Sequence, residues 1–407
     1  MRQTRSRSRA LLLISAATFF SLSVWFSTNA ISGALEVEKS IDESSIALLT
    51  IAVQLGFVFG TLVIAFTNLS DLINARTMFA ISAVLAAATN LLVIPLESTP
   101  MLIAARFATG AFLGGVYPPA MKIISGWYTT GRGFALGTMV GALTIGSGSP
   151  HLLRSVFSEN WQAVIIGSSV LAVLGGLVLK FLVADGPHDV RGAKFNPRYL
   201  IGALTKRGPA LALTGYLGHQ WEIYAMWTWI GSFMLYVVGE KPLLDDGLEL
   251  ASALTFLVFA FGAAACVYAG VWSEKIGRTA TASIAMVVSG GIASFVGFLS
   301  PDSTVLIVFI VVLVMIWGAA VVADSAQFST AMTELSDPVY RGTMLTFQTG
   351  IGFALTAVTI WLLPIIRDSS GWGWAFAMLA IGPLVGTIAM MRLRSIPEAT
   401  MLAGGRR

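Results

Sequence analysis

Stretches of about twenty consecutive apolar residues recur along the whole of this 407-residue chain. A helix rises about 1.5 Å per residue, so about twenty apolar residues cross the roughly 30 Å hydrocarbon core of a bilayer. Only 11% of the residues are charged, against about 25% in an ordinary water-soluble domain. The pattern therefore predicts an all-α membrane protein. We place its twelve transmembrane helices at 10–32, 45–67, 76–95, 100–123, 133–153, 162–183, 209–238, 250–272, 280–299, 304–330, 342–366 and 374–393.

The basic residues test this count, because twelve spans put both ends of the chain on one side of the membrane. Of the 25 Lys and Arg residues, 20 fall in tails and loops on that side, and Arg106 lies within a span. Only Lys39, Arg154, Lys241 and Arg367 fall on the other side. Basic loops stay in the cytoplasm. We expect a multi-pass protein of the bacterial inner membrane with cytoplasmic N- and C-termini.

The chain divides into two similar halves. The polar, basic loop 184–208 is the longest, and it separates six spans in residues 1–183 from six in residues 209–407. Short turns follow the second span of each half, and each carries an acid at its fifth position (Asp71 and Glu274) and an arginine near its end (Arg76 and Arg278). Two parallel repeats around a central path are typical of secondary transporters. We expect two pseudo-symmetric six-helix bundles joined by a cytoplasmic linker.

These motifs resemble those of the major facilitator superfamily. The turn Gly270–Thr279 is similar to that family's Gly-x-x-x-Asp-x-x-Gly-Arg loop, with Glu274 in the place of the Asp. The fourth span carries Arg106–Gly110, similar to the family's Arg-x-x-x-Gly motif. The resemblance covers nearly the whole chain and implies transport by alternating access between the two halves. It also implies that Arg106 takes part in coupling.

The acid and arginine of each turn are candidates for a conformational latch, formed by Asp71 and Arg76 in the first half and by Glu274 and Arg278 in the second. An acid at the end of one helix can interact with the positive N-terminus of a neighbouring helix, and an arginine beside it can pair with the acid. Such contacts would hold the halves together in one state and release them in another. The alternative is that these charges are solvated anchors of the topology.

Ionisable residues inside a span are functional candidates, because burying a charge in the membrane is costly. His219 and Glu222 lie one turn apart near the middle of the seventh span, and we assign them to proton coupling. Trp221, Tyr224 and Trp227 surround them and form a candidate binding wall for a planar solute. A structural His–Glu pair inside an interfacial aromatic belt is the alternative.

Three further polar residues lie in other spans. Asp324, late in the tenth span, is a second candidate for proton coupling, with a substrate contact or a polar group at a helix end as the alternatives. Arg106 is a candidate substrate contact, or it bonds to the carbonyls of a neighbouring helix. Gln348 in the eleventh span is a candidate contact along the path or mere packing.

The chain contains no phosphate-binding Gly-x-x-x-x-Gly-Lys-Ser/Thr loop, no catalytic triad and no metal-ligand spacing, so we expect neither an enzyme nor a metal or cofactor site. The predicted function is proton-coupled uptake of a small organic solute, such as a vitamin or another planar metabolite. The expected partners are the solute, protons and the lipid bilayer, with no nucleic acid, and the protein is expected to be a monomer. A proton-driven efflux antiporter is the first alternative, and a membrane sensor or assembly factor that transports nothing is the second.

Overall fold

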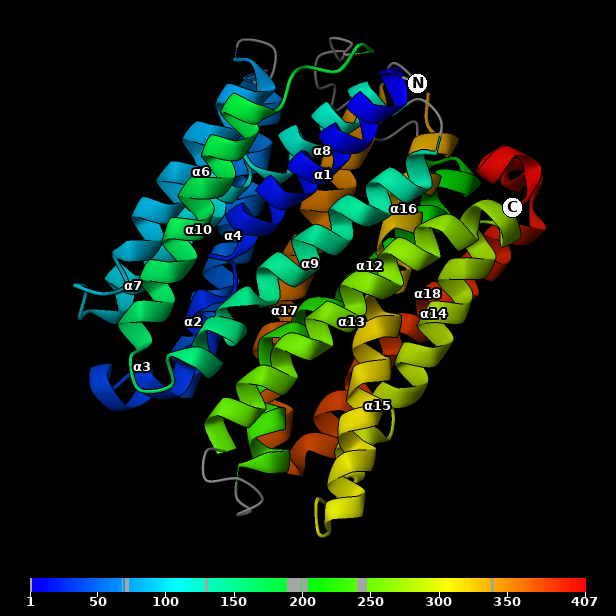
Figure 1. Ribbon diagram of the computed structural model, residues 1–407. Coiled ribbons are helices and arrows are strands. Elements are labelled where there is room, and N and C mark those ends of the chain that lie inside the picture. The colour runs from blue at the N-terminus through cyan, green and yellow to red at the C-terminus, as the bar shows by residue number, and fades with distance from the viewer. Residues whose placement is uncertain are drawn as a thin grey trace.

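The structure, a computed structural model, describes residues 2–67, 69, 73–128, 131–188, 199, 204–239, 247–337 and 340–407. Within these residues the regular structure is helical. The long helices run side by side in one direction across the molecule, and both termini lie toward the same end (Figure 1). We call this the terminal end and the other the opposite end.

The helices before residue 189 form what we call the N-terminal half. The first span is interrupted, because α1 ends at Leu22 and the chain makes a turn before α2 begins at Ser27. The bounds of the helices in this half are α1 Arg2–Leu22, α2 Ser27–Ala30, α3 Ser32–Lys39, α4 Glu43–Thr67, α6 Ala75–Leu91, α7 Thr99–Leu113, α8 Tyr117–Trp127, α9 Arg132–Val156 and α10 Trp161–Leu182.

The helices after residue 203 form the C-terminal half. Within α17 the left-handed Gly371, at a φ of 81°, marks the turn between the last two spans. The bounds are α12 Arg207–Val238, α13 Gly247–Ile276, α14 Arg278–Ala293, η1 Val296–Phe298, α15 Thr304–Ala323, α16 Ser325–Leu335, α17 Arg341–Ala377, η3 Met378–Ala380, α18 Ile381–Ser395 and η4 Pro397–Gly405.

Each of the twelve predicted spans coincides with one helix or with consecutive helices, so the predicted all-α fold is confirmed. Three of the predicted spans are broken well inside their bounds. The first is interrupted at residues 23–26, the fourth at residues 114–116 just before the paired prolines of α8, and the tenth at Asp324. An apolar pattern reports length and environment, but it does not reveal a local break whose backbone groups are satisfied from elsewhere.

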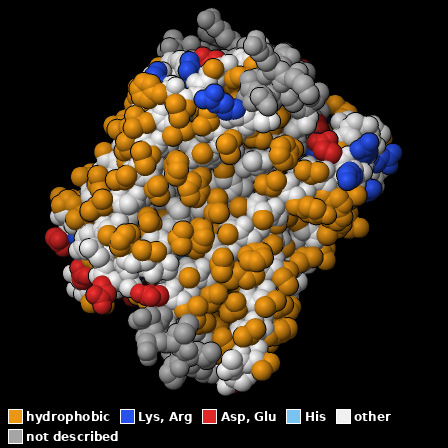
Figure 2. Space-filling model, viewed as in Figure 1, with side chains coloured by type: hydrophobic (Ala, Val, Ile, Leu, Met, Phe, Trp, Pro, Cys, Tyr) orange, Lys and Arg blue, Asp and Glu red, His pale blue; other side chains and the backbone are white. Residues whose placement is uncertain are grey.

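The surface suits a membrane. Seven of the described segments are long and apolar enough to cross one: Ser44–Thr67, Thr99–Trp127, Trp161–Leu182, Gly247–Ile276, Arg278–Phe298, Thr304–Leu335 and Arg341–Ser395. Hydrophobic side chains cover the middle of the visible face, and charged side chains gather toward its two ends (Figure 2). Such a belt is what a lipid-embedded protein exposes.

The two halves meet closely along α9 and α13. A Cβ atom added at Gly137 of α9 would stand 2.9 Å from the Cys266 carbonyl oxygen of α13, and one at Gly133 would stand 2.8 Å from the Gly270 carbonyl oxygen. Small residues let two backbones approach in this way where no hydrophobic effect drives association. The two helices form the contact between the halves, and a cavity described below lies beside α9.

Candidate functional site

A cavity of about 530 Å³, which we call the main cavity, lies between the two halves. It runs from Tyr224 and Trp227 in the middle of α12 to Ser125 and Gly342, which lie near helix ends at the terminal end of the molecule. Both halves contribute to its wall, the N-terminal half through α4, α8 and α9 and the C-terminal half through α12, α16 and α17.

A single stripe of α12 faces the main cavity. Its members repeat at intervals of three and four residues, which is the spacing of one helical face. They are Tyr216, His219, Gln220, Ile223, Tyr224 and Trp227. The stripe includes two of the three aromatic residues predicted to form the binding wall. The third, Trp221, does not line the main cavity; its indole nitrogen donates to the Met378 carbonyl oxygen at 3.1 Å.

His219 pairs with Asp324, a contact that sequence spacing did not suggest. Its Nδ1 lies 2.8 Å from Asp324 Oδ1, and its Nε2 lies 3.1 Å from the Ser325 hydroxyl oxygen. Asp324 occupies the break between α15 and α16, so its carboxylate stands at the beginning of a helix. The His219 and Asp324 side chains are only 4% and 3% exposed, so this titratable pair is buried where the cavity wall meets the helix break.

Glu222 is buried too, but it points away from the main cavity and forms no pair with His219. One carboxylate oxygen accepts a hydrogen bond from the Trp317 indole at 2.7 Å, and the other accepts one from the Ser289 hydroxyl at 2.9 Å. These donors come from α15 and α14, so Glu222 lies inside the C-terminal half. Residues three apart on a helix differ in direction by about 60°, enough to separate the surroundings of His219 and Glu222.

Arg106 lies outside the main cavity, and its guanidinium satisfies the break in the first span. One terminal nitrogen donates to the Val24 carbonyl oxygen at 3.1 Å and to Asn90 Oδ1 at 2.7 Å, and the other donates to the Trp25 carbonyl oxygen at 2.6 Å. The side chain is fully buried. The carbonyl-bonding alternative is therefore the geometry found, and Arg106 is not among the residues that line the main cavity.

Gln348 does not line the main cavity either. Its side chain is 1% exposed, and its amide atoms make no hydrogen bond to any residue that the structure describes. Phe353, further along the same helix, does line the main cavity. The sequence alone does not show whether Gln348 faces the cavity or the protein interior, because its span is apolar on several faces.

An aromatic cluster, which we call the aromatic closure, ends the main cavity toward the opposite end. It joins the two halves, since Phe26 lies 6.0 Å from Trp227 and Phe57 lies 4.7 Å from Phe353, measured between ring centroids. Tyr224 packs at 4.8 Å against Phe353. The members are Trp25, Phe26, Phe57, Tyr224, Trp227, Phe259 and Phe353. The break in the first span places Trp25 and Phe26 in this cluster.

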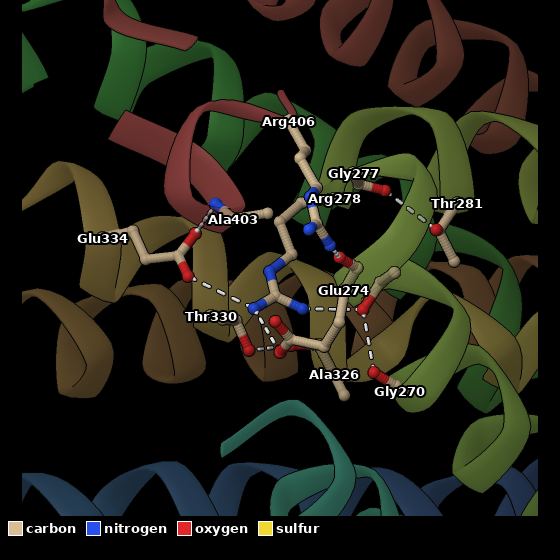
Figure 3. Close-up of polar contacts among 11 residues, drawn as sticks. Gly270, Glu274, Gly277, Arg278, Thr281, Ala326, Thr330, Glu334, Ala403 and Arg406 are labelled. Carbon is tan, nitrogen blue, oxygen red and sulfur yellow. Dashed lines mark hydrogen bonds and ion pairs between the residues drawn. The ribbon is translucent and has the colours of Figure 1, made fainter. Parts of the chain in front are cut away.

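The residues of the second turn form an ion-pair cluster at the terminal end. Arg278 lies between two acids, 2.8 Å from Glu274 Oε1 and 3.3 Å from Glu334 Oε1 (Figure 3). The second oxygen of Glu334 accepts from the Ala403 backbone nitrogen at 3.0 Å, and Arg406 donates to the Glu274 carbonyl oxygen. These contacts together tie α13, α14, α16 and η4 to one another within the C-terminal half.

Glu274 also reaches the other half. A Cβ atom added at Gly133, in the first turn of α9, would stand 2.5 Å from Glu274 Oε1. The carboxylate therefore lies beside the positive N-terminus of α9, where a negative charge is favourable. At the symmetry-related position, a Cβ atom at Gly342 would have no described atom within 4 Å. The halves touch at the start of α9, and the start of α17 borders the main cavity.

The first turn behaves differently. Arg76 forms an ion pair with Asp185 at 2.9 Å and donates to the Val183 carbonyl oxygen at 2.8 Å, so it fixes the chain that follows α10. Asp71, the other candidate latch residue of this turn, lies outside the described residues.

Several cavity residues escaped the sequence analysis because they are not ionisable at neutral pH or lie near span ends. The hydroxyl and aromatic residues Thr61, Tyr117, Thr144 and Tyr216 line the main cavity, as do Lys122 and Arg341 near the terminal end. The three- and four-residue spacing along the seventh span could have identified Tyr216 and Gln220. Nothing in the sequence alone distinguishes the lining residues of α4 and α9 from their lipid-facing neighbours.

The family model of the Major Facilitator Superfamily matches residues 13–354. Among solved structures, a variant of the nucleoside transporter NupG matches with a TM-score of 0.71 and 13% identity, covering 94% of this chain and 99% of that one. The proton:xylose symporter XylE bound to 6-bromo-6-deoxy-D-glucose matches with a TM-score of 0.73 and 14% identity, covering 95% of this chain and 96% of that one. No curated protein sequence gives a significant match. At these identities the two structures establish the fold, and the family match establishes membership: this chain belongs to the Major Facilitator Superfamily and is a membrane transporter by family.

Proposed function

We propose that this protein takes up a small, uncharged, planar organic solute across the bacterial inner membrane, together with protons, by alternating access between its two halves. The observation that carries the proposal is the main cavity, which is shared by both halves, reaches the terminal end and stops at the aromatic closure. With both termini in the cytoplasm, as the basic residues predict, this geometry corresponds to an inward-facing state. The halves are residues 1–183 and 209–407, joined by the linker 184–208, and they move as two bodies in this scheme.

The wall of the main cavity supports a planar solute. Tyr117, Tyr216, Tyr224 and Trp227 offer ring faces for stacking. Two buried polar atoms beside them, the Trp227 indole nitrogen and Gln220 Oε1, make no hydrogen bond to any described residue. One is a donor and the other an acceptor, so a solute with both kinds of group on its edge would satisfy them. The similarity to a nucleoside transporter and a sugar symporter agrees with an uncharged, hydrogen-bonding solute.

Two buried acids support proton coupling. Asp324 pairs with His219 at the cavity wall, and a proton taken up by the Asp324 carboxylate would remove its charge and weaken the attraction that ties the start of α16 to α12. Glu222 joins α12 to α14 and α15 through hydrogen bonds that its ionised form accepts. Each acid therefore connects the cavity-lining helix to the rest of the C-terminal half, where protonation can change how α12 packs.

The ion-pair cluster supports a switch between states. Glu274 lies beside the start of α9 in the other half, while Arg278 and Glu334 hold it in position. Its separation from α9 is the step by which the terminal end would open further. The protein acts as a monomer in this scheme, because one chain supplies the whole main cavity.

The test is flux into proteoliposomes with and without an imposed pH gradient. Glu222→Gln should abolish proton-driven accumulation while leaving counterflow exchange, because glutamine keeps the side-chain shape but binds no transported proton. Asp302→Asn, a change of an exposed loop acid, is the matched control. Accumulation that survives Glu222→Gln would remove this residue from the coupling mechanism.

The same assay separates the alternatives. Solute accumulation in inverted vesicles driven by an inside-acid gradient would identify a proton-driven efflux antiporter. A purified protein that binds solutes but catalyses no exchange in either direction would identify a sensor or an assembly factor. Candidate solutes are found first by thermal shift, since a ligand that binds only the folded state raises its stability.

A further inference from the structure

A second cavity of about 460 Å³ lies between the halves at the opposite end of the molecule. Its wall comes from the α2–α3 region, the end of α9, the second half of α12 and the start of α13. The aromatic closure separates it from the main cavity: Trp227 belongs to the closure and the main cavity, whereas Thr228 and Gly231 line the second cavity.

Two nitrogen-bearing side chains of α9 dominate this second cavity. His151 and Arg154 lie one turn apart on the same helical face, and they are 4% and 7% exposed. His151 Nε2 makes no hydrogen bond to any residue that the structure describes. The Arg154 guanidinium donates a long hydrogen bond of 3.5 Å to the Phe157 carbonyl oxygen. The Glu38 carboxylate acts on it electrostatically across the cavity, but no described carboxylate lies within ion-pair distance of it.

The rest of the wall mixes apolar side chains with hydroxyl groups, one amide and one acid. Hydroxyl groups come from Ser32, Thr228, Ser232, Ser252 and Thr255, and an amide comes from Asn29. The acid is Glu38, and one of its oxygens already accepts from the Trp161 indole at 2.7 Å. A buried cation with spare donors costs free energy until an anion or another acceptor satisfies it.

We propose that the second cavity is a binding site for the carboxylate of a small organic anion, held by the Arg154 guanidinium and the His151 ring. A planar guanidinium offers paired donors that match the two oxygens of a carboxylate. The hydroxyl groups on α12 and α13 complete the polar surroundings. This site is separate from the main cavity and does not depend on the proposed proton coupling.

The site is placed to influence the aromatic closure. The His151 ring stacks on Phe259 with 6.0 Å between centroids, and Phe259 packs on Trp227 at 5.0 Å. A Cβ atom at Gly231 would stand 3.3 Å from His151 Cε1, so His151 also lies against α12. An anion bound to His151 therefore stabilises the packed closure, and it should oppose opening of the molecule at this end.

The experiment measures equilibrium binding of benzoate and indole-3-acetate to the purified full-length protein by calorimetry, with their uncharged amides as controls at equal ionic strength. We expect saturable binding of at least one anion and at least tenfold weaker binding of its amide. Arg154→Gln should weaken anion binding at least tenfold. Arg367→Gln, which removes a cation at the same end but outside the second cavity, should not change it.

Three glycines without a positive φ have no described atom within 4 Å of an added Cβ, so the first carbon of a larger side chain has room at each: Gly33, Gly291 and Gly342. Gly33 lines the second cavity, so Gly33→Trp should abolish anion binding. Gly342 lines the main cavity, so Gly342→Trp should stop solute flux and leave anion binding intact. Gly291→Trp lines neither cavity and should alter neither property.

The outcomes are decisive in both directions. The proposal is overturned if neither anion binds saturably, if the amides bind as well as the anions, or if Gly33→Trp or Arg154→Gln binds anions with unchanged affinity. Loss of anion binding in Gly342→Trp would place the anion in the main cavity and would overturn it as well. A protein that binds anions at this site but transports nothing would refute the proposed function and leave the second site standing.

Discussion

Replacing Arg106 by methionine tests whether this residue holds the break in the first span. The guanidinium donates to the Val24 and Trp25 carbonyl oxygens, which face the break and have lost their helical partners. The Ser27 hydroxyl lies 2.7 Å from Asn90 Oδ1 and 3.1 Å from the Val24 carbonyl oxygen, but its one proton satisfies only one of them. Arg106→Met therefore leaves two of three buried acceptors, the Val24 and Trp25 carbonyl oxygens and Asn90 Oδ1, without a donor, and it removes little volume.

The expected magnitude follows from these two groups. A buried acceptor left without its donor costs about 1–3 kcal/mol, so two cost about 2–6 kcal/mol. Removing a buried cation returns part of that cost, which moves the expectation to the lower half of the range. At about 2.1 cal/mol/K of unfolding entropy per residue, a 407-residue chain shifts by roughly 1 °C for each kcal/mol, so the apparent melting temperature should fall by about 2–4 °C. The melting temperature of Arg106→Lys should fall less, because an ammonium can still donate to one of the two carbonyls.

The chain offers a convenient assay. Its single cysteine, Cys266, is fully buried, so a thiol-reactive fluorescent dye reports unfolding as this side chain becomes accessible. Arg9→Met, which changes an exposed arginine of α1, the helix that precedes the break, is the control and should melt like the original protein. A melting temperature for Arg106→Met within about 1 °C of that control would refute the claim that Arg106 stabilises the break.

Three further perturbations address the main cavity and its two ends. Asp324→Asn removes the ion pair with His219, so proton-driven accumulation should be lost while exchange persists, and unchanged dependence of flux on the pH gradient would contradict this. Gly133→Val places a methyl group against Glu274, which should separate the halves at the terminal end and speed alkylation of a cysteine introduced in the main cavity at least threefold; an unchanged rate would show that the contact is not a latch. Phe26→Ala removes a ring that bridges the halves, so flux should fall at least tenfold or the solute should leak without coupling, and normal coupled flux would show that other rings suffice for the closure.

The spans could be predicted because burial in lipid imposes a length and a composition that one sequence displays directly. The breaks in the first and tenth spans could not. Residues 23–26 are as apolar as their surroundings, apart from one serine, and their free carbonyls are acceptable only because Arg106 arrives from another span. A break stabilised from a distance leaves no local signal.

The pairing of His219 shows the same limit for the site. Spacing along one helix brings His219 and Glu222 within a turn of each other, and the sequence therefore favoured them as partners. In the folded chain each finds its partner on a different helix, His219 on the break at Asp324 and Glu222 on Ser289 and Trp317. The residue types correctly predicted which positions carry buried ionisable side chains. The partner of each side chain depends on packing between spans more than 60 residues apart, which one sequence does not show.

The two halves use the same pair of spans for opposite purposes. In the N-terminal half, Arg106 of the fourth span bonds to the break in the first span. In the C-terminal half the roles are exchanged: His219 of the seventh span, which corresponds to the first, contacts the break in the tenth span, which corresponds to the fourth. An arginine keeps its charge at any physiological pH, so the N-terminal contact is permanent. A carboxylate–imidazole pair can gain or lose a proton, so the C-terminal contact is adjustable. If protons drive this transporter, the N-terminal half therefore stays constant and the C-terminal half responds to protonation. An Arg106 variant should then lower the stability of the protein at every pH. An Asp324 variant should instead change how solute flux depends on pH.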